Sequence, residues 1–362
     1  MVPILSKSKK TILHITETLT GGVATVVTQL SEFDGCSYLI GPESQAKDVS
    51  SFSGDRFWFK HKSRSVLALL RCYFLAVKVS VSLKPNIIHL HSSFALPLAP
   101  FLKFFLFFYK SKILYQPHGV FYDPDVPRAK AKIVFIKMLE RFFCVFIDGI
   151  VCISEHEAMA VTKLHGFKKT HLLRNAVAPS NVKYSSKGRV GYLFVGRLDE
   201  QKGIDILTEF WSKKIPDEIL TVVGSTVRGG VEVAESNNIK YLGWVGAAEL
   251  DLLYSKAKAV IVPSRWEGFG LVVIEAFRNG TPVIASNKGA LPELVGHEKT
   301  GYILDFNTFE VGLLRSISNI NNLEGVFEDL SIACLDEYQS KYTLSKYLIS
   351  YECLIDCFVD KK

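Results

Sequence analysis

Residues 263–276 read Pro-Ser-Arg-Trp-Glu-Gly-Phe-Gly-Leu-Val-Val-Ile-Glu-Ala, and this stretch decides the fold of the C-terminal half. The β-branched run 259–262 before it predicts a buried strand, and residues 271–279 predict a helix. Glycines at such a junction let a ligand approach the backbone. The first turn of the helix adds unpaired N–H groups and a positive dipole end. The pattern is typical of a phosphate site in an α/β fold.

Two carboxylates, Glu267 and Glu275, belong to this motif. A carboxylate beside a diphosphate would be repelled by it, so we expect both side chains to accept hydrogen bonds from sugar hydroxyl groups. A carboxylate has two oxygens, and these match two adjacent ribose hydroxyls.

A second motif, residues 195–203, reads Val-Gly-Arg-Leu-Asp-Glu-Gln-Lys-Gly and also joins a predicted strand to a predicted helix. Arg197 and Lys202 lie on either side of a turn, so both can reach one diphosphate. Two fixed cations would stabilise the charge that builds on a diphosphate as it leaves.

Short β-branched runs alternate with helical patterns along the chain, which predicts parallel sheets with crossover helices. The alternation stops at a polar stretch and then restarts. The chain has 362 residues, more than one hydrophobic core usually serves. We therefore predict an α/β protein with two doubly wound, Rossmann-like domains and ligands at the carboxyl ends of the strands. The predicted parts are an N-terminal domain 1–178, a linker 179–189, a C-terminal domain 190–335, and a C-terminal helix 336–362 that packs back toward the first domain.

Charge is unevenly distributed between the two halves. Residues 1–180 contain 23 Lys and Arg against 12 Asp and Glu, whereas residues 181–362 contain 20 against 24. A basic N-terminal half favours an anionic partner such as phospholipid or a pyrophosphate-linked acceptor. No nucleic-acid reader motif accompanies the charge, so we expect no nucleic-acid partner.

Three apolar segments, 65–83, 94–109 and 133–153, raise the question of a membrane. Each is interrupted by charged residues or is too short, so we expect none of them to span a bilayer. Two interpretations stay open: helices that lie in the membrane interface, and core helices of an α/β domain. Residues 1–10 lack the long apolar run of a signal peptide. The seven cysteines include no C-x-x-C pair, which predicts buried free thiols in a reducing compartment.

Together these motifs resemble glycosyltransferase family 4, whose members have the two-domain GT-B fold and usually retain anomeric configuration. Glu267 and Glu275 match the family's E-x7-E pattern, and Arg197 and Lys202 match its Arg/Lys pair. The resemblance covers residues 11–305 and is weaker in the N-terminal half. The matching residues there are Gly21, Gly22 and Val23, His118 and Gly119, Ser154 and Glu155, and Asn175, Ala176 and Val177.

The resemblance implies a role for each residue. Glu275 would hold the ribose, and Glu267 the hydroxyls of the transferred sugar. Arg197 and Lys202 would hold the diphosphate, and His118 would contact the donor sugar. The donor would also meet a second group of residues, namely Gly21, Gly22, Gly268, Phe269, Gly270, Leu271 and Val272. The acceptor part of the cleft would include Gly22, Ser154, Glu155 and Asn175.

No cofactor and no metal are expected, because the family usually needs none. Asp123-Pro124-Asp125 is a D-x-D, the metal-binding pattern of the other large glycosyltransferase fold. It lies in a proline-rich loop after His118, away from the first nucleotide-binding unit, so we expect no metal there. His89 and His91 also end a predicted strand, and we interpret them as structural or rim residues.

These observations predict an enzyme that transfers a hexosyl unit from a nucleoside-diphosphate sugar, most simply a UDP-sugar, to a saccharide acceptor. We expect the acceptor to be lipid-linked and part of a cell-surface polysaccharide such as lipopolysaccharide or O-antigen. The expected location is the cytoplasm, at the inner face of the cell membrane. Two alternatives stay open: a sugar-nucleotide epimerase or hydrolase of the same architecture, and a non-catalytic protein that binds a sugar nucleotide or anionic lipid at the membrane surface.

Overall fold

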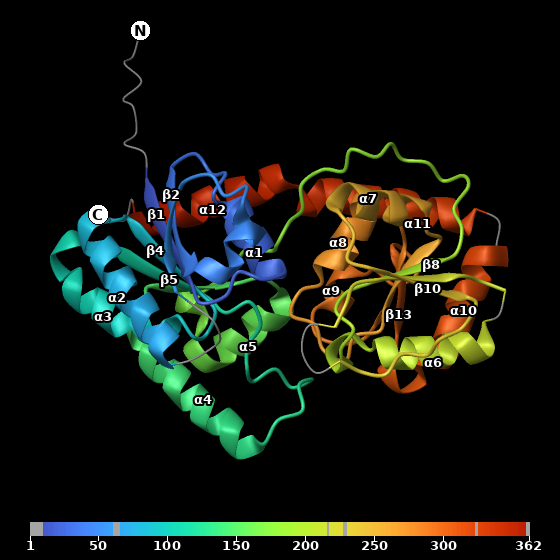
Figure 1. The fold of residues 1–362 in the computed structure, drawn as a ribbon, viewed down its shortest axis with the longest axis horizontal. Helices are drawn as coiled ribbons and strands as arrows, with labels where there is room; N and C mark the ends of the chain where they lie inside the picture. The colour runs from blue at the N-terminus through green and yellow to red at the C-terminus, as the bar shows by residue number, and fades with distance from the viewer. Residues whose placement is uncertain (1–9, 61–65, 216, 227–229, 323–324, 360–362) are drawn as a thin grey trace, which may run out of the picture. The chain divides into compact units, whose positions relative to one another are not determined.

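The computed structural model describes residues 10–60, 66–215, 217–226, 230–322 and 325–359, and the chain divides into two compact units (Figure 1). The first unit contains residues 1–122, 128–174 and 345–362, and the second contains residues 123–127 and 175–344. The second unit thus begins at Asn175, before the predicted linker. The chain returns to the first unit at Ser345 rather than at residue 336. Residues 1–9, where the sequence predicts no signal peptide, lie outside the described residues.

The first unit has a seven-stranded parallel sheet in the order β3-β2-β1-β4-β5-β6-β7. Its strands are β1 (Thr11–Thr16), β2 (Cys36–Pro42), β3 (Asp55–Phe59), β4 (Ile87–His91), β5 (Lys112–Gln116), β6 (Gly149–Cys152) and β7 (Thr170–Leu172). Its α-helices are α1 (Gly22–Leu30), α2 (Val66–Leu83), α3 (Ala99–Phe105), α4 (Lys130–Phe143), α5 (Glu155–His165) and α12 (Leu344–Val359). Five short 3-10 turns complete the unit: η1 (Glu43–Val49), η2 (Leu96–Leu98), η3 (Phe107–Tyr109), η4 (Cys144–Phe146) and η5 (Phe167–Lys169).

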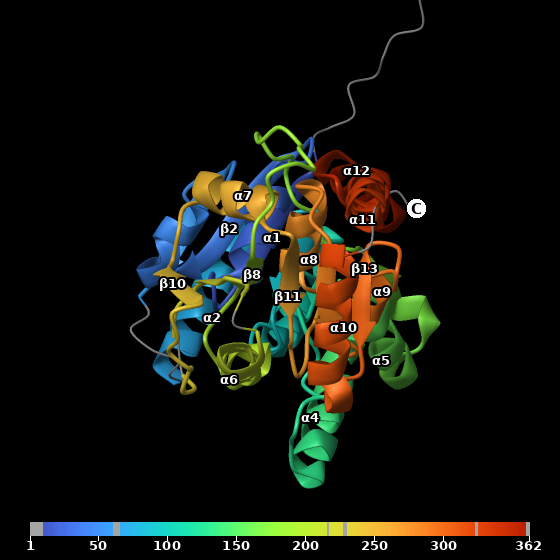
Figure 2. The ribbon, with the colours of Figure 1, turned by 90° about the vertical axis from the view of Figure 1, so that its right-hand side faces the viewer.

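The second unit has a six-stranded parallel sheet in the order β10-β9-β8-β11-β12-β13 (Figure 2). Its strands are β8 (Tyr192–Val195), β9 (Leu220–Val223), β10 (Ile239–Gly243), β11 (Ala259–Val262), β12 (Val283–Ser286) and β13 (Gly301–Leu304). Its α-helices are α6 (Ile204–Lys214), α7 (Ala247–Lys256), α8 (Leu271–Arg278), α9 (Leu291–Leu294), α10 (Phe309–Asn322) and α11 (Val326–Glu337). Two 3-10 turns, η6 (Glu200–Lys202) and η7 (Phe306–Thr308), and a π-helical turn η8 (Tyr338–Tyr342) complete it.

Both sheets confirm the predicted α/β class, and most predicted strands and helices are present. The sequence analysis did not predict β3, α5 or the four-residue α9, whereas α3 lies within the apolar segment 94–109 that it interpreted as a helix. β3 is an edge strand of which only Phe59 is buried, and α5 buries only Glu157 and Val161. Neither element therefore carries the regular apolar pattern from which it could be recognised.

The thiol prediction is correct for Cys72, Cys144, Cys152 and Cys334, which are buried and free. It is wrong for Cys353 and Cys357, which are exposed on α12. By length and composition alone, α2 is apolar enough to cross a membrane, despite the Arg71 and Lys78 that led us to expect no spanning helix. In the structure α2 joins β3 to β4, and its Cys72 and Ala76 pack in the core of the first unit.

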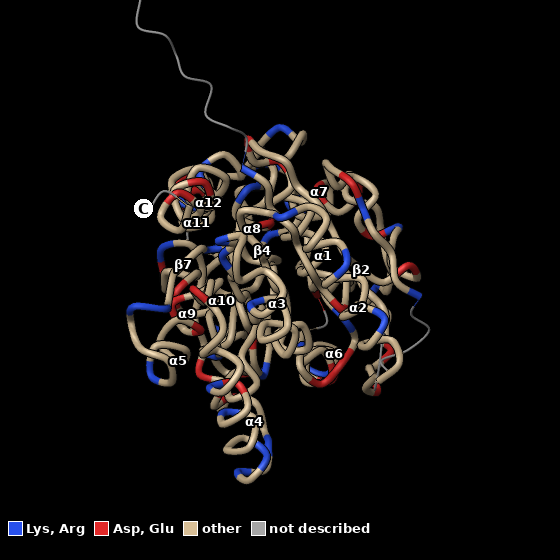
Figure 3. Tube along the Cα trace, turned by 90° about the vertical axis from the view of Figure 1, so that its left-hand side faces the viewer, with Lys and Arg blue, Asp and Glu red and all other residues tan. Residues whose placement is uncertain are grey.

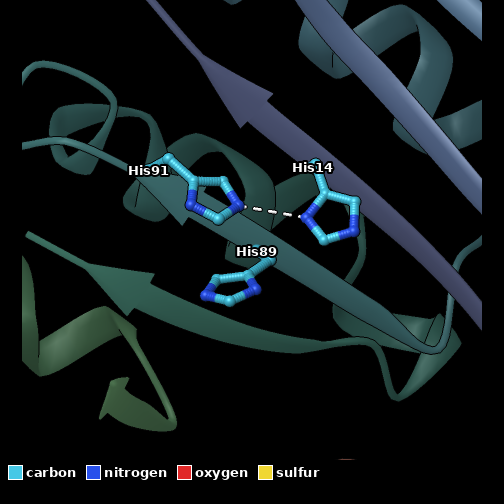
Figure 4. A group of neighbouring side chains, drawn as sticks. All are labelled: His14, His89 and His91. Carbon is cyan, nitrogen blue, oxygen red and sulfur yellow. Dashed lines mark hydrogen bonds between the residues drawn. The ribbon is translucent and has the colours of Figure 1, made fainter. Parts of the chain in front are cut away.

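Alternation along β1 and β4 divides the core of the first unit into two kinds of surface. Leu13, Ile15, Ile88 and Leu90 join the apolar core with residues of α2, α3 and α5. Because neighbouring residues of a strand point to opposite faces, the residues that alternate with these four point to the other face of the sheet. Three of these are histidines, His14, His89 and His91, and all are fully buried (Figure 4). They are thus core residues, consistent with the structural interpretation of His89 and His91 and not with a place at the rim.

The buried histidines are neutral. Burial lowers the pKa of His14 to about 3, and it lowers the pKa of His89 and His91 well below the usual value, helped by repulsion between the rings. α12 covers this face, because the Tyr351 hydroxyl lies 3.1 Å from Nδ1 of His89 and the two rings stack. The last helix is therefore part of the packing around the histidines.

We predict that the protein loses stability as the pH falls below about 6.5, because these three histidines and His118 bind protons in the unfolded chain but not in the folded one. The buried carboxyls of Glu157 and Glu275 act in the opposite direction, since burial raises the pKa of Glu157 to about 7 and also raises that of Glu275. Four groups against two leave a net difference of about two protons, or about 3 kcal/mol for each pH unit. Chemical denaturation between pH 7 and pH 5 measures this slope.

The variant His89→Phe supplies the control for this prediction. It removes one titrating group and keeps an aromatic ring, so its slope should be smaller by about 1.4 kcal/mol for each pH unit. An unchanged slope in His89→Phe would show that His89 is protonated in the folded protein.

Candidate functional site

The strand order of the second unit changes direction between β8 and β11. The chain proceeds from β8 to β9 and β10 on one side, and then returns to β11, β12 and β13 on the other. Loops that leave two such strands diverge, and ligands of open α/β sheets bind in the opening at their carboxyl ends. The two motifs of the sequence analysis, residues 196–203 and 263–270, are the loops that follow β8 and β11.

The loop after β8 presents two cations. Arg197 is 41% exposed, and its guanidinium donates to Oε1 of Gln201 at 2.6 Å and pairs with Asp199 at 3.1 Å. Asp199 also accepts from the backbone N–H of Lys202 at 3.1 Å, which caps the turn η6. Arg197 therefore keeps one exposed surface while acidic and amide oxygens hold it in place.

The second cation, Lys202, pairs directly with Glu267 of the other loop. Its Nζ lies 2.5 Å from Oε2 of Glu267, and both side chains are mostly buried. Ser264 adds a longer hydrogen bond to the same carboxylate oxygen at 3.4 Å. The sequence predicted both residues as site residues but not this pairing, because the motifs lie more than sixty residues apart.

Residues outside the predicted set tie the two loops together. Arg265 donates to both carboxylate oxygens of Asp205, at 2.8 and 2.7 Å, and to the carbonyl of Glu200 at 2.7 Å. Gln201 also links the two loops. Its amide nitrogen donates to the carbonyl of Trp266 at 3.3 Å, and its amide oxygen accepts from the guanidinium of Arg197. The sequence analysis did not identify Arg265, Asp205 or Gln201 as site residues. The available signal in the sequence was an arginine in one loop and an aspartate just after the other, since a guanidinium can donate two hydrogen bonds to one carboxylate.

Glycines make the close approach of the loops possible. Gly203 has φ +67°, and a Cβ there would collide with the carbonyl oxygen of Pro263. Gly289 has φ +55°, and a Cβ there would collide with the carbonyl oxygen of Glu267. The loop after β12 is itself fixed by Asp125, which accepts from Gly289 N at 2.8 Å and pairs with Lys288 at 3.2 Å. Asp125 of the D-x-D pattern therefore has a structural role in this unit.

The helix α8 begins next to the ion pair of Lys202 and Glu267. Its N-cap, Gly270, has φ +100° and supplies no side-chain cap, and no acidic residue lies in the first turn. The N–H groups of Leu271 and Val272 thus lie at the positive end of the helix. Phe269 contributes differently, since its ring is buried and packs edge-on against Tyr342 at 6.3 Å.

Glu275 lies one turn further along α8. Its Oε2 accepts a hydrogen bond from the Tyr254 hydroxyl at 2.8 Å. Burial raises the pKa of Glu275, and the bond from Tyr254 and the nearby Arg278 act against that rise. Tyr254 thus holds one carboxylate oxygen in a fixed orientation, and the sequence gave no sign of this partner.

The first unit has its own change of direction, between β1 and β4. The loop after β1 ends at Gly21, which has φ +59° and caps α1, and Gly22 is exposed at the first position of that helix. His118 follows β5 in a left-handed conformation with φ +58°, and Gly119 has φ +116°. Nε2 of His118 lies 2.9 Å from Nδ1 of His91, and burial lowers the pKa of His118 to about 3.

The remaining predicted residues have different surroundings. Ser154 is fully buried and caps α5 by accepting from Glu157 N at 3.0 Å, so its hydroxyl is already used. Glu155 is exposed and pairs with Arg174. Asn175 is buried, and its side-chain oxygen has no hydrogen-bond partner among the described residues. Glu157, which the sequence analysis did not single out, accepts from Gly119 N at 2.7 Å and from Ile153 N at 2.8 Å.

The arrangement in the second unit combines two cations, a helix N-terminus and two carboxylates. Cations and N–H groups suit a diphosphate, and carboxylates suit hydroxyl groups. The first unit brings glycine backbone, a neutral imidazole and the buried carboxylate of Glu17, which accepts from Ser92 Oγ at 3.4 Å, to its corresponding edge. Such groups can position a sugar but cannot balance the charge of a diphosphate.

Comparison with known proteins agrees with this chemistry. Residues 39–181 match the model of Glycosyltransferase Family 4, and residues 181–319 match that of Glycosyl transferases group 1. An uncharacterized 41.2 kDa protein in the cps region of Klebsiella pneumoniae is 32% identical over 94% of this chain and 98% of its own. O-antigen chain mannosyltransferase B of Escherichia coli is 45% identical over 69 residues, 19% of this chain and 18% of its own.

The fold has close relatives among solved structures. Anabaena HepE in complex with UDP-glucose superposes with a TM-score of 0.78 and 16% identity, over 95% of this chain and 99% of that one. At this identity the likeness concerns the fold alone, which is that of GT-B glycosyltransferases. The matches to the two family models and to the full-length relative place the chain in the family: it belongs to the glycosyltransferases of the family 4 and group 1 type, and it is a glycosyltransferase.

Proposed function

We propose that this enzyme transfers a hexosyl unit from a nucleoside-diphosphate sugar to a saccharide acceptor and retains the anomeric configuration. The observation that carries the proposal is the pairing of Lys202 with Glu267 beside Arg197 and the N-terminus of α8. The proposed roles follow from the charges. Arg197, Lys202 and the N–H groups of Leu271 and Val272 bind the diphosphate, and Glu267 accepts from hydroxyls of the transferred sugar.

Lys202 can serve both partners at once. An ammonium group has three N–H donors, so Nζ can hold Glu267 with one and a phosphate oxygen with another. As the bond to the sugar breaks, negative charge grows on the diphosphate, and Arg197 and Lys202 stabilise it. These cations are the charges that a metal would otherwise supply, so we propose a reaction without a metal or another cofactor.

We propose that Glu275 holds the ribose of the donor. Tyr254 occupies part of one oxygen, and the other oxygen is left for a hydroxyl pair. His118 is proposed to contact the donor sugar. The donor is proposed to be a UDP-sugar; HepE, which shares the fold, was solved in complex with UDP-glucose. A thermal-shift screen of UDP-, GDP-, ADP- and dTDP-sugars, with release of free nucleotide as a second readout, tests the donor. No shift with any donor would count against the proposal.

If Glu275 holds the ribose, its replacement should weaken the binding of ligands that have free ribose hydroxyls. In Glu275→Gln we expect UDP to bind about 100-fold more weakly, because two hydrogen bonds to a charged group are weakened. Wild-type protein should bind 2′,3′-dideoxy-UDP as weakly as the variant binds UDP. The variant should bind UDP and its dideoxy form equally, as measured by isothermal titration calorimetry. If the variant still prefers UDP by the wild-type factor, Glu275 does not contact the ribose.

If Arg197 binds the diphosphate, its replacement should weaken the binding only of ligands that carry phosphate. Arg197→Gln should weaken UDP binding about 10-fold or more and leave uridine binding unchanged, because only the diphosphate interaction is removed. Lys213→Gln is the matched control, since Lys213 is an exposed cation on α6 that pairs with Glu209. Equal loss for uridine and UDP would assign Arg197 a structural role.

An exposed face of the first unit supports a lipid-linked acceptor. We call it the apolar-basic face and define it by exposed side chains of α2, α3, η3, α4 and η4: Val66, Leu67, Leu70, Phe74, Phe101, Phe104, Phe105, Phe107, Phe108, Tyr109, Val134, Phe135, Met138, Leu139, Phe142 and Val145. Phe104 and Phe107 are each 77% exposed, and Phe108 is 87% exposed. Large exposed apolar patches mark an interaction surface.

The charges around this face select an anionic partner. Residues 66–112 contain six Lys and Arg and no acidic residue, and residues 128–148 contain five Lys and Arg together with Glu140 and Asp148, of which Asp148 pairs with Lys103 and Lys112. Figure 3 shows Lys and Arg along α3 and α4. Glu140 is buried, so it does not offset the exposed charge. Aromatic side chains among cations suit the surface of an anionic bilayer.

We therefore propose that the enzyme binds peripherally to the inner face of the cell membrane from the cytoplasm and acts on a lipid-linked acceptor in cell-surface polysaccharide synthesis. Relatives support this context, since one is described as a protein of a cps region and another as an O-antigen chain mannosyltransferase.

Membrane binding can be measured with vesicles. We expect the protein to sediment with phosphatidylglycerol vesicles but not with phosphatidylcholine vesicles, and to be partly released by 0.5 M salt because salt screens the charges. The double variant Phe104→Ser/Phe108→Ser should bind at least 10-fold more weakly, since it removes apolar area from the contact. Phe167→Ser is the control, because Phe167 is 86% exposed outside this face. Equal effects of both variants would contradict the assignment of this face.

A further inference from the structure

A chain of three hydrogen-bonded imidazoles runs through the first unit from β1 to the end of β5. Nδ1 of His14 lies 3.0 Å from Nε2 of His91, and Nδ1 of His91 lies 2.9 Å from Nε2 of His118. Figure 4 shows the ring nitrogens of His14 and His91 facing each other. His14 and His91 are fully buried, whereas His118 is partly exposed at the carboxyl end of β5.

All three rings are neutral, because burial lowers the pKa of each of them far below the pH of the cell. A neutral imidazole carries one N–H and one bare nitrogen, so a ring that accepts at one nitrogen must donate from the other. The tautomers of the three rings are therefore coupled. Either every ring carries its proton on Nδ1, or every ring carries it on Nε2.

The surroundings of His14, at the buried end of the row of imidazoles, distinguish the two tautomeric states. Nε2 of His14 is buried and has no hydrogen-bond partner among the described residues. With protons on Nε2, this atom would be a buried N–H without an acceptor, and orphaned buried donors are the rarer kind of unpaired group. With protons on Nδ1, His14 donates to His91, His91 donates to His118, and only a bare nitrogen is left unpaired.

We propose that His91 and His14 are positioning residues that hold His118 as its Nδ1–H tautomer, so that His118 offers a hydrogen-bond donor to the sugar-nucleotide donor. The inference rests on the proposed function for the contact between His118 and the substrate. The tautomer matters there because a ring with Nδ1–H can donate a hydrogen bond to an oxygen of the donor sugar. A His118 ring with a bare Nδ1 could only accept one.

The backbone around His118 is held as firmly as its ring. The left-handed conformation of a non-glycine residue costs about 1 kcal/mol or more and persists only where the surroundings fix it. Glu157 fixes it by accepting from the next residue, Gly119, at 2.7 Å. Ser92, directly after His91, is also left-handed, and its N–H donates to the carbonyl of Gln116 at 3.0 Å. The end of β4 is thus tied to β5 beside His91, and the residue after His118 is tied to α5.

A metal held by His14, His89 and His91 is the competing explanation for three neighbouring imidazoles. The ring geometry disfavours it. The rings of His89 and His91 lie 4.2 Å apart with an angle of 34° between their planes. Lone pairs of imidazole lie in the ring plane, so two rings that face each other in this way do not direct them at one ion.

The first test needs no substitution in the chain of imidazoles. In protein labelled with 15N-histidine, nitrogen shifts distinguish a protonated from a bare ring nitrogen, and the spectrum of His118→Gln assigns the His118 signals. We expect protonated Nδ1 and bare Nε2 in His118. The opposite tautomer, or a rapidly exchanging mixture, would overturn the proposal. This outcome does not depend on whether His118 contacts substrate.

The second test separates positioning from packing with two variants of one residue. His91→Phe keeps an aromatic ring but donates nothing to His118, whereas His91→Asn is smaller and keeps an amide donor near the position of Nδ1. We expect kcat for release of nucleoside diphosphate from the UDP-sugar to fall at least 10-fold in His91→Phe, with KM changed less than 3-fold. His91→Asn should stay within about 3-fold of wild type although it unfolds more easily, because it leaves a cavity.

A merely structural role predicts the reverse order, with the less stable His91→Asn also the less active, and that result would overturn the proposal. His89→Phe is the control, since His89 stacks on His91 but lies outside the hydrogen-bonded chain, and its kcat should stay within 2-fold of wild type. Tight binding of one Zn2+ per chain that is lost in both His14→Phe and His89→Phe would replace the proposal by a metal site. Wild-type activity in His118→Gln would instead refute the proposed contact of His118 and leave the tautomer result standing.

Discussion

The ion pair between Lys202 and Glu267 is the constraint on which the candidate site depends. It places a carboxylate and an ammonium group where two diverging loops would otherwise separate, and both side chains are mostly buried. Removing one partner of such a pair leaves a buried charge and costs about 3–5 kcal/mol. The pair therefore fixes the position of Glu267 before substrate arrives, and Arg265 with Asp205 holds the same two loops on their outer side. A site held in this way would not need to reorganise its charges on binding the diphosphate of the proposed donor.

The two units use one topological device with different chemical groups. In each sheet the strand order reverses beside the first strand, and glycines and polar residues follow the strands that flank the reversal. The second unit supplies two cations there, whereas the first supplies imidazoles whose pKa is lowered by burial and the carboxylate of Glu17. The division suits a reaction in which one part of the substrate is a dianionic leaving group and the other part is an uncharged sugar.

The sequence was sufficient for the fold and for the charged residues of the second unit, since a strand, a glycine loop and a helix each leave a local pattern. It was insufficient for the partners that hold them. Tyr254 lies on a different helix from Glu275, and Gln201 contacts Arg197 within a turn that has no distinguishing pattern. Ser154 shows that one pattern can have two meanings, because a serine before a helix is as typical of an N-cap as of a ligand site; here it forms the cap, and its place near the acceptor stays a prediction. Long-range pairing, such as that of His14 with His91, is decided by the register of β1 and β4, which sequence alone does not give.

The burial of the residues of α4 explains why its apolar sequence pattern fits both a core helix and a helix in the membrane interface. A core helix turns apolar residues inward, but the only fully buried residue of α4 is Glu140. This carboxylate accepts from the Tyr122 hydroxyl at 2.8 Å and lies 3.2 Å from Nε2 of His165. Polar contacts and the half-buried Ile133 and Phe143 attach α4 to the first unit, and Val134, Phe135, Met138 and Phe142 are left on the outside. Exposing so much apolar area to water brings no hydrophobic stabilisation to the fold. The same area would contribute about 25 cal/mol for each Å² once a bilayer covers it. This second, exposed apolar side of α4 is therefore what a helix needs if that side is to be buried by a lipid surface rather than by the protein's own core.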